Sequence, residues 1–215
     1  MNEVTIDCVV FGYDNGSLKV LLSKGNKGVG TKWGLISGIA KDAKKADETA
    51  LDLLNEFGNF ENVFLKQLTE GAGTNSQTLR YYTVINIEDY RVKFGVVDLY
   101  QRWFMITDVP DLIQDHNLIL DYSLYQLEKC VRESPVDFNL LPEKFTISEL
   151  MNLYKGILGI ETDKDSFSRK FLKQKVVVPL KEKKENVSEK GDKLYKFNAA
   201  FFNKCASKDF VLDFK

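Results

Sequence analysis

The stretch FTISELMNLYKGILGIETDKDSFSRKFLKQKVVV (Phe145–Val178) contains two helix patterns separated by a short break. Glu149 follows Thr146 by three residues, which is the spacing of a helix-capping box. Apolar residues then recur at helical spacing as far as Gly159, where a left-handed residue is expected to end the helix. The stripe consists of Ile147, Leu150, Leu153, Tyr154, Ile157 and Leu158.

A second, shorter helix is predicted over Lys164–Lys173, with Asp163 as its cap. Its inward side chains are expected to be Phe167, Phe171 and Leu172. Apolar runs beginning at Val176 and at Leu194 predict two strands, and the segment between them is rich in lysine and glutamate. A helix, a turn, a second helix and a β-hairpin within about 60 residues are typical of a winged helix-turn-helix.

The polar face of the second helix suits DNA recognition. Arginine and lysine reach guanine edges or phosphates, and serine contacts either. The predicted DNA-binding residues on this helix are Ser166, Ser168, Arg169, Lys170 and Lys173. Lysines of the hairpin suit a wing along the phosphate backbone, and those predicted to bind DNA are Lys183, Lys190 and Lys193. The alternative is a solvated helix in a small α/β module.

The charge is unevenly distributed along the 215 residues. Residues 1–137 hold 14 Lys and Arg against 20 Asp and Glu, whereas residues 138–215 hold 16 against 11. A basic half of this kind favours a polyanionic partner, although a lysine-rich solvated surface gives the same counts. The expected partner is double-stranded DNA.

The first half predicts a mixed α and β domain. Two stretches rich in apolar residues, Val4–Tyr13 and Leu18–Ser23, flank an Asp14-Asn15-Gly16 turn and predict a hairpin. A helix is predicted over Lys44–Phe57, with Gly58 as the left-handed residue after it. Three further strands are predicted at Val63–Leu68, Leu79–Ile87 and Arg102–Ile106. Residues Asp111–Glu133 are predicted to be mainly helical, in two pieces around His116. The fold class is therefore α+β.

The segment Trp33–Gly58 resembles a Nudix box, the magnesium-binding motif of diphosphate hydrolases. WGLISG (Trp33–Gly38) is similar to the start of that motif, but Leu51 stands where the motif has arginine and Asn55 where it has a glutamate. Asp52 and Glu56 remain, and such a helical acidic stripe is more typical of a solvated face. We expect no enzymatic activity, no metal and no cofactor; the alternative is a Nudix hydrolase.

The whole chain resembles the Nudix-related transcriptional regulators. The stretches that carry the resemblance are TIDCVVFGYDNGSLKVLLSK (Thr5–Lys24), NVFLKQL (Asn62–Leu68), RWFMITDVPDLIQDH (Arg102–His116), FNLLPEKFTISELMNLYKGILG (Phe138–Gly159), DKDSFSRKFLK (Asp163–Lys173) and KLYKFN (Lys193–Asn198). The resemblance implies a Nudix-like effector-sensing domain over 1–137 and a winged helix-turn-helix domain over 138–215. It also implies a homodimer that binds operator DNA under the control of a small molecule, and a structural role for His116.

Members of this family sense either ADP-ribose or sugars such as arabinose. The loop that is rich in arginine in the ADP-ribose sensors retains only Arg80 here. The sequence therefore favours a sugar effector and control of pentose catabolism, with an ADP-ribose sensor in NAD metabolism as the alternative. The predicted effector-binding residues are Asp52, Glu56, Glu70, Arg80 and Trp103.

Cysteine and hydropathy patterns indicate the compartment. Cys8, Cys130 and Cys205 form no CxxC pair, which fits a reducing environment. A single histidine excludes a multi-histidine metal site. Because no apolar run approaches the roughly 18 residues of a membrane helix, we expect a cytoplasmic protein without a membrane partner.

Overall fold

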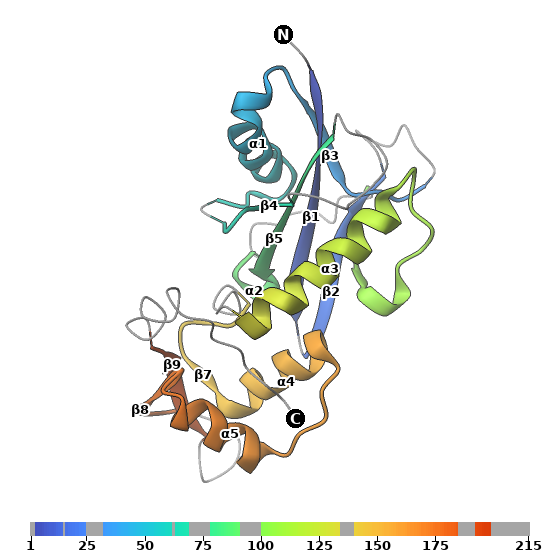
Figure 1. Ribbon diagram of the computed structural model, residues 1–215. Helices are drawn as coiled ribbons and strands as arrows, with labels where there is room; N and C mark the ends of the chain where they lie inside the picture. The colour runs from blue at the N-terminus through green and yellow to red at the C-terminus, as the bar shows by residue number, and fades with distance from the viewer. Residues whose placement is uncertain are drawn as a thin grey trace. The chain divides into compact units, whose positions relative to one another are not determined.

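The chain forms two compact units in the computed structural model (Figure 1). The first comprises Met1–Asp14 and Leu18–Gln126, and the second Asn15–Ser17 and Leu127–Lys215. The structure describes residues 3–14, 16–24, 32–61, 63–68, 78–90, 100–133, 140–184 and 192–198. The predicted domain boundary at residues 137/138 lies outside these ranges and stays a prediction.

The first unit is built on a mixed sheet around β1 (Val4–Asp14). β1 runs parallel to β5 and antiparallel to β3, as the residue pairs Asp7–Arg80 and Asp7–Ser37 show. The path through the sheet is β4-β5-β1-β2-β6, with β3 off that path on β1. The other strands are β2 (Ser17–Ser23), β3 (Ile36–Ala40), β4 (Lys66–Leu68), β5 (Thr78–Asn86) and β6 (Gln101–Met105). The predicted α+β fold class is confirmed.

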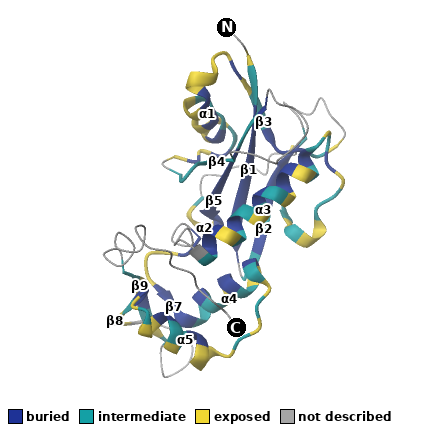
Figure 2. Cartoon of the chain, in the orientation of Figure 1, coloured by how far each residue is buried: buried dark blue, intermediate teal, exposed yellow. Residues whose placement is uncertain are grey.

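Both faces of β1 are covered, so the strand is buried along most of its length (Figure 2). Helix α1 (Ala46–Gly58) packs Ala46, Ala50 and Leu54 against the face that carries Ile6, Cys8 and Val10. Alternation along the strand sends Asp7 to the opposite face, where it meets the start of α3 (His116–Glu133). Two short 3-10 helices, η2 (Ala43–Lys45) and η3 (Ile106–Asp108), and the four-residue α2 (Ile87–Tyr90) complete the described elements of this unit.

The end of α1 differs from the prediction. Gly58 is the last helical residue, and Asn59 adopts the left-handed conformation with φ of 48°. A Cβ on residue 58 would overlap the ring of Phe60, which is buried against it. Glycine is required at 58 for this close approach, and asparagine tolerates the left-handed position after it.

Two further elements of the first unit are shorter than expected. The predicted helix over Asp111–Glu133 begins only at His116, because residues 111–115 form turns that precede it. Only Lys66–Leu68 of the predicted strand Val63–Leu68 pairs, with Tyr82, Tyr81 and Arg80 on β5. No helix in the described part of the chain is long and apolar enough to cross a membrane.

The second unit has the predicted helix-turn-helix and hairpin. Thr146 and Glu149 form the capping box of α4 (Ile147–Leu158), and Gly159 ends that helix at φ of 60°. Asp163 caps α5 (Lys164–Lys173). A three-stranded sheet of order β7-β9-β8 closes the unit, formed by β7 (Phe145–Thr146), β8 (Val177–Lys183) and β9 (Lys193–Phe197).

An aromatic cluster holds α4 and α5 together. The ring of Tyr154 lies 5.7 Å from that of Phe167 and 5.1 Å from that of Phe171, while the two phenylalanine rings stack at 4.4 Å. The prediction that Leu172 faces inward is wrong, since this side chain is 37% exposed. Phe167 and Phe171 are one helical turn apart and already fill the space against Tyr154.

Candidate DNA-binding and effector-binding sites

Helix α5 presents a polar face because its apolar face packs into the interior of the second unit. Phe167 and Phe171 are almost fully buried, which leaves Ser166, Arg169 and Lys173 exposed. Ser168 and Lys170 are half-buried beside them. Ser166, Arg169 and Lys173 therefore share the exposed side of the helix, and Ser168 and Lys170 lie at its two edges; contact of these five residues with DNA stays a prediction.

The predicted wing lysines fall only partly within the described structure. β8 and β9 pair in antiparallel register with Lys183 opposite Lys193, and Lys193 is exposed. The side chain of Lys183 and all of Lys190 lie outside the described residues. Lys184, also on the hairpin, binds the Glu149 carboxylate at 2.5 Å and so ties the hairpin to the start of α4.

Glu149 joins the capping box to that lysine. Burial opposes its ionisation, but hydrogen bonds from Lys184 and from the Thr146 backbone and hydroxyl outweigh burial and hold the pKa of Glu149 below its ordinary value. The carboxylate is therefore ionised at neutral pH and contacts two elements at once.

The residues predicted to bind the effector are not gathered in one place. Asp52 and Glu56 lie on the exposed side of α1, together with Glu48, so this acidic stripe is the solvated face expected from the sequence. Arg80 lies on the other face of the sheet, where its guanidinium is 3.9 Å from Asp115 and donates to the Thr78 carbonyl at 3.3 Å. Among the described residues, no group of three His, Cys, Asp or Glu could hold a metal ion.

Trp103 is a packing residue of the sheet. A Cβ on Gly12 would lie 2.6 Å from its ring, so the indole covers the glycine closely and contacts the core on the α1 side. Glu70 lies outside the described residues. The predicted set Asp52, Glu56, Arg80 and Trp103 is thus distributed over both faces of the sheet, and contact with an effector stays a prediction for each.

A buried polar network lies where β1 and β3 meet α3. The backbone N–H of Leu35 donates to Nδ1 of His116 at 2.9 Å, and the Ser37 hydroxyl donates to Asp7 at 2.6 Å. Nε2 of His116 is 3.7 Å from the same Asp7 oxygen. Burial lowers the pKa of His116 against the opposing charges of Asp7 and Asp115, so the imidazole is neutral. The expected hydrogen-bonding role of His116 is confirmed.

Sequence reasoning missed a cluster of aromatic and basic side chains formed by Lys24, just after β2, by Trp33, just before β3, and by Arg102 and Phe104 on β6. The rings of Trp33 and Phe104 meet edge to face at 5.0 Å. The Lys24 ammonium lies 4.7 Å from the Trp33 ring, and the Arg102 guanidinium lies 5.2 Å from that of Phe104. This aromatic–basic cluster offers ring faces and two cations, which suit a nucleotide base and phosphates. The pairing of strands far apart in sequence hid it.

The comparisons agree with this architecture. Residues 137–197 match the family model of the NrtR DNA-binding winged helix domain. A curated relative, the ADPR responsive transcriptional repressor NtrR of Acinetobacter baylyi, is 26% identical over 186 residues, which cover 81% of this chain and 74% of the relative.

Two solved structures share the fold over nearly the full length. Shewanella oneidensis NrtR in complex with a 27mer DNA has a TM-score of 0.77 at 23% identity and covers 99% of each chain. The same protein without DNA has a TM-score of 0.75 at 22% identity and covers 99% of this chain and 100% of its own. The chain therefore has the fold of Shewanella oneidensis NrtR over nearly its full length, and its residues 137–197 match the NrtR-type DNA-binding winged helix domain.

Proposed function

We propose that the protein is a transcriptional regulator that binds operator DNA through its winged helix and responds to ADP-ribose through its Nudix-like domain. The observation that carries the proposal is the NrtR-type winged helix over residues 137–197. The exposed basic face of α5 supports it, because Arg169 and Lys173 stand clear of the apolar core. A regulator of this kind acts on DNA in the cytoplasm.

ADP-ribose replaces the sugar that the sequence favoured. The curated relative, whose match covers 81% of this chain, is described as responsive to ADP-ribose, and none of the similar proteins named above is described as a regulator of pentose catabolism. The sequence favoured a sugar because the loop 73–80 retains a single arginine, and residues 73–77 of that loop lie outside the described structure. Residue type is a weak guide to phosphate sites, because backbone N–H groups bind phosphates equally well.

Among the described residues of the first unit, the aromatic–basic cluster offers the ring faces and the cations that suit ADP-ribose. A purine stacks on Trp33 or Phe104, and Lys24 and Arg102 neutralise a diphosphate. Replacement of the cation in Arg102→Gln is expected to weaken ADP-ribose binding about tenfold, measured by calorimetry. Glu56→Gln on α1 is the matched control and is expected to bind like the wild type; the opposite ranking would place the effector at the box helix.

The Nudix-like domain is proposed to bind without hydrolysis. A diphosphate hydrolase needs several carboxylates around magnesium, whereas Asp52 and Glu56 stand beside Asn55 and Leu51 on an exposed helix face. Incubation with ADP-ribose and magnesium is expected to release no AMP. Turnover that disappears in Glu56→Gln would restore the hydrolase interpretation.

The first experiment is a ligand comparison on the full-length protein. ADP-ribose is expected to raise the unfolding temperature, because a ligand that binds only the folded state stabilises it by about 2.7 kcal/mol at one hundred times its Kd. Arabinose is the control and is expected to leave it unchanged. Stabilisation by arabinose alone would contradict the proposed effector.

A homodimer is part of the proposal. Two winged helices related by a two-fold axis would meet the two halves of a palindromic operator. Light scattering of the purified protein should give twice the chain mass of 24.6 kDa. A monomer that binds a single half-site would contradict this assembly.

A further inference from the structure

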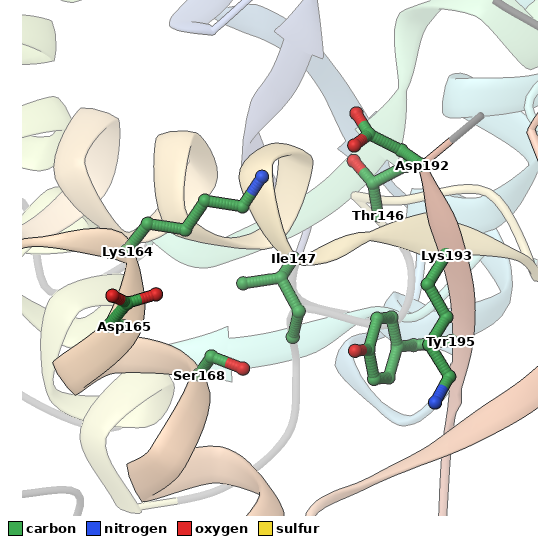
Figure 3. A pocket seen from close by; sticks show the side chains of 8 residues that line it. All are labelled: Thr146, Ile147, Lys164, Asp165, Ser168, Asp192, Lys193 and Tyr195. Carbon is green, nitrogen blue, oxygen red and sulfur yellow. The ribbon is translucent and has the colours of Figure 1, made fainter. Parts of the chain in front are cut away.

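A small cavity lies inside the second unit, where the start of α4, the start of α5 and strand β9 meet (Figure 3). Its volume is about 170 Å³, enough for a group of several heavy atoms. Ile147 contributes an apolar wall, and most of the rest is lined by Lys164, Asp165, Ser168, Asp192, Lys193 and Tyr195. None of the comparisons assigns a role to it.

Two hydroxyl groups face this cavity without a partner. The Tyr195 side chain is nine-tenths buried, yet its hydroxyl points into the cavity, as does that of Ser168 from α5 (Figure 3). Within the described part of the chain, neither hydroxyl has a hydrogen-bond partner. Both hydroxyls therefore reach solvent through the cavity and can donate to an acceptor that enters it from outside.

The charges around the cavity favour an anion at the hydroxyls. The Lys193 ammonium lies over the Tyr195 ring at 5.9 Å, and Lys164 lines the cavity from the first turn of α5. Asp165 and Asp192 also line the cavity, so the two lysines must turn toward a bound anion to outweigh these carboxylates. Long lysine side chains can turn toward a bound phosphate, whereas the two hydroxyls are already in place.

We propose that this cavity binds one phosphate of the DNA backbone, with Tyr195 and Ser168 as hydrogen-bond donors and Lys164 and Lys193 as counter-charges. The inference rests on the proposed DNA-binding function and adds Lys164 and Tyr195 to it. The cavity adjoins the exposed face of α5, since Ser168, at the edge of that face, lines the cavity. A phosphate held between α5 and β9 sets the depth and orientation of α5 in the major groove; it carries no sequence information itself.

The test uses the full-length protein and a duplex selected by it from random sequence. Tyr195→Phe keeps the ring and removes only the hydroxyl, so the fold is preserved. The expected result is about tenfold weaker DNA binding in a fluorescence anisotropy titration, because a hydrogen bond to a charged acceptor is lost. Tyr125→Phe, which removes a hydroxyl from a 58% exposed side chain on α3, is the matched control and should bind like the wild type.

The salt dependence of DNA binding distinguishes the contribution of the Tyr195 hydroxyl from that of the Lys164 charge. Tyr195→Phe should leave the slope of log K against log salt unchanged, whereas Lys164→Gln should reduce its magnitude by about 0.9. DNA binding by Tyr195→Phe within twofold of the wild type would overturn the inference and leave the proposed function standing. A wild-type protein that selects no duplex at all would overturn both.

Neutral methylphosphonate linkages locate the phosphate. The phosphate linkages of the selected duplex are replaced one at a time. At one position the replacement should weaken DNA binding by the wild type but should hardly change DNA binding by Tyr195→Phe. Such non-additivity shows that the hydroxyl and the phosphate interact directly. Additive losses at every position would contradict the inference.

Discussion

His116 illustrates how a single residue organises the first unit. Its Nδ1 accepts the N–H of Leu35 at 2.9 Å, which settles the neutral tautomer and fixes the loop before β3. Gly34 leaves room for the ring, since a Cβ there would lie 3.0 Å from Nδ1. The histidine is therefore a structural residue of the α3 junction, and its titration is coupled to folding.

The stability of the fold should depend on pH through His116. Its folded-state pKa lies below the ordinary 6.5, so the unfolded chain takes up the proton first as the pH falls. The free energy of unfolding should thus decrease below about pH 6.5. In His116→Asn the amide oxygen can replace Nδ1 without titrating, and the stability difference between wild type and variant should shrink from pH 7.5 to 5.5. A difference that grows toward low pH in urea unfolding would contradict this assignment.

Gly58 and Asn59 provide a second test at the residue scale. Gly58→Ala places a methyl group against the Phe60 ring and should cost about 2 kcal/mol in the free energy of unfolding. Asn59→Gly is the control, and it should be neutral or slightly stabilising, because Asn59 holds the left-handed position. A free energy of unfolding that is unchanged in Gly58→Ala would contradict the close packing of residue 58 against the Phe60 ring.

At the scale of elements, the features that depend on local sequence were predictable. The capping box of α4, the Asp163 cap of α5 and the left-handed Gly159 all involve residues within a few positions of each other. The strands β3 and β7 escaped prediction, because five and two residues form strands only when β1 and β9 pair with them. Sequence could not tell that Arg80 and Asp52 lie on different faces of the sheet, since this depends on strand register.

The link between α4 and the hairpin should be visible in stability. Glu149→Gln removes a charged partner of both Thr146 and Lys184, and should lower the stability by about 1 kcal/mol at pH 7. Because the pKa of Glu149 is held below 4.5, its contribution is present above that pH and is lost as the pH falls through the folded-state value. Chemical unfolding of both proteins at pH 7 and pH 3.5 measures this contribution. An equal loss of unfolding free energy in Glu149→Gln at both pH values would contradict the proposed contacts of Glu149 with Thr146 and Lys184.

The polar face of α5 should dominate DNA binding. Arg169→Ala and Lys173→Ala should each weaken binding to a selected duplex and reduce the salt slope if they contact phosphates, with the fold intact by circular dichroism. Lys44→Ala, on the exposed η2 helix of the first unit, is the control for loss of charge. Binding unchanged by both α5 variants would move the DNA contacts away from this helix.

At the scale of the whole molecule, the proposed function requires that an effector site in one unit and a DNA-binding site in the other affect each other. The sequence indicated both parts: an altered Nudix box with Asn55 and Leu51 in the motif, and a basic winged helix. It favoured a sugar effector, whereas the effector proposed from the curated relative is ADP-ribose. A count of arginines such as Arg80 says little about how phosphates are bound. The aromatic–basic cluster became visible only once β2 and β6 were paired.

The most direct measurement is the affinity for a selected duplex at increasing ADP-ribose. We predict that ADP-ribose changes the DNA affinity by at least fivefold, within the usual range of coupling between two sites. By reciprocity, the duplex must change the affinity for ADP-ribose by the same factor, which calorimetry can verify. A DNA affinity that stays constant while ADP-ribose saturates the protein would contradict the account.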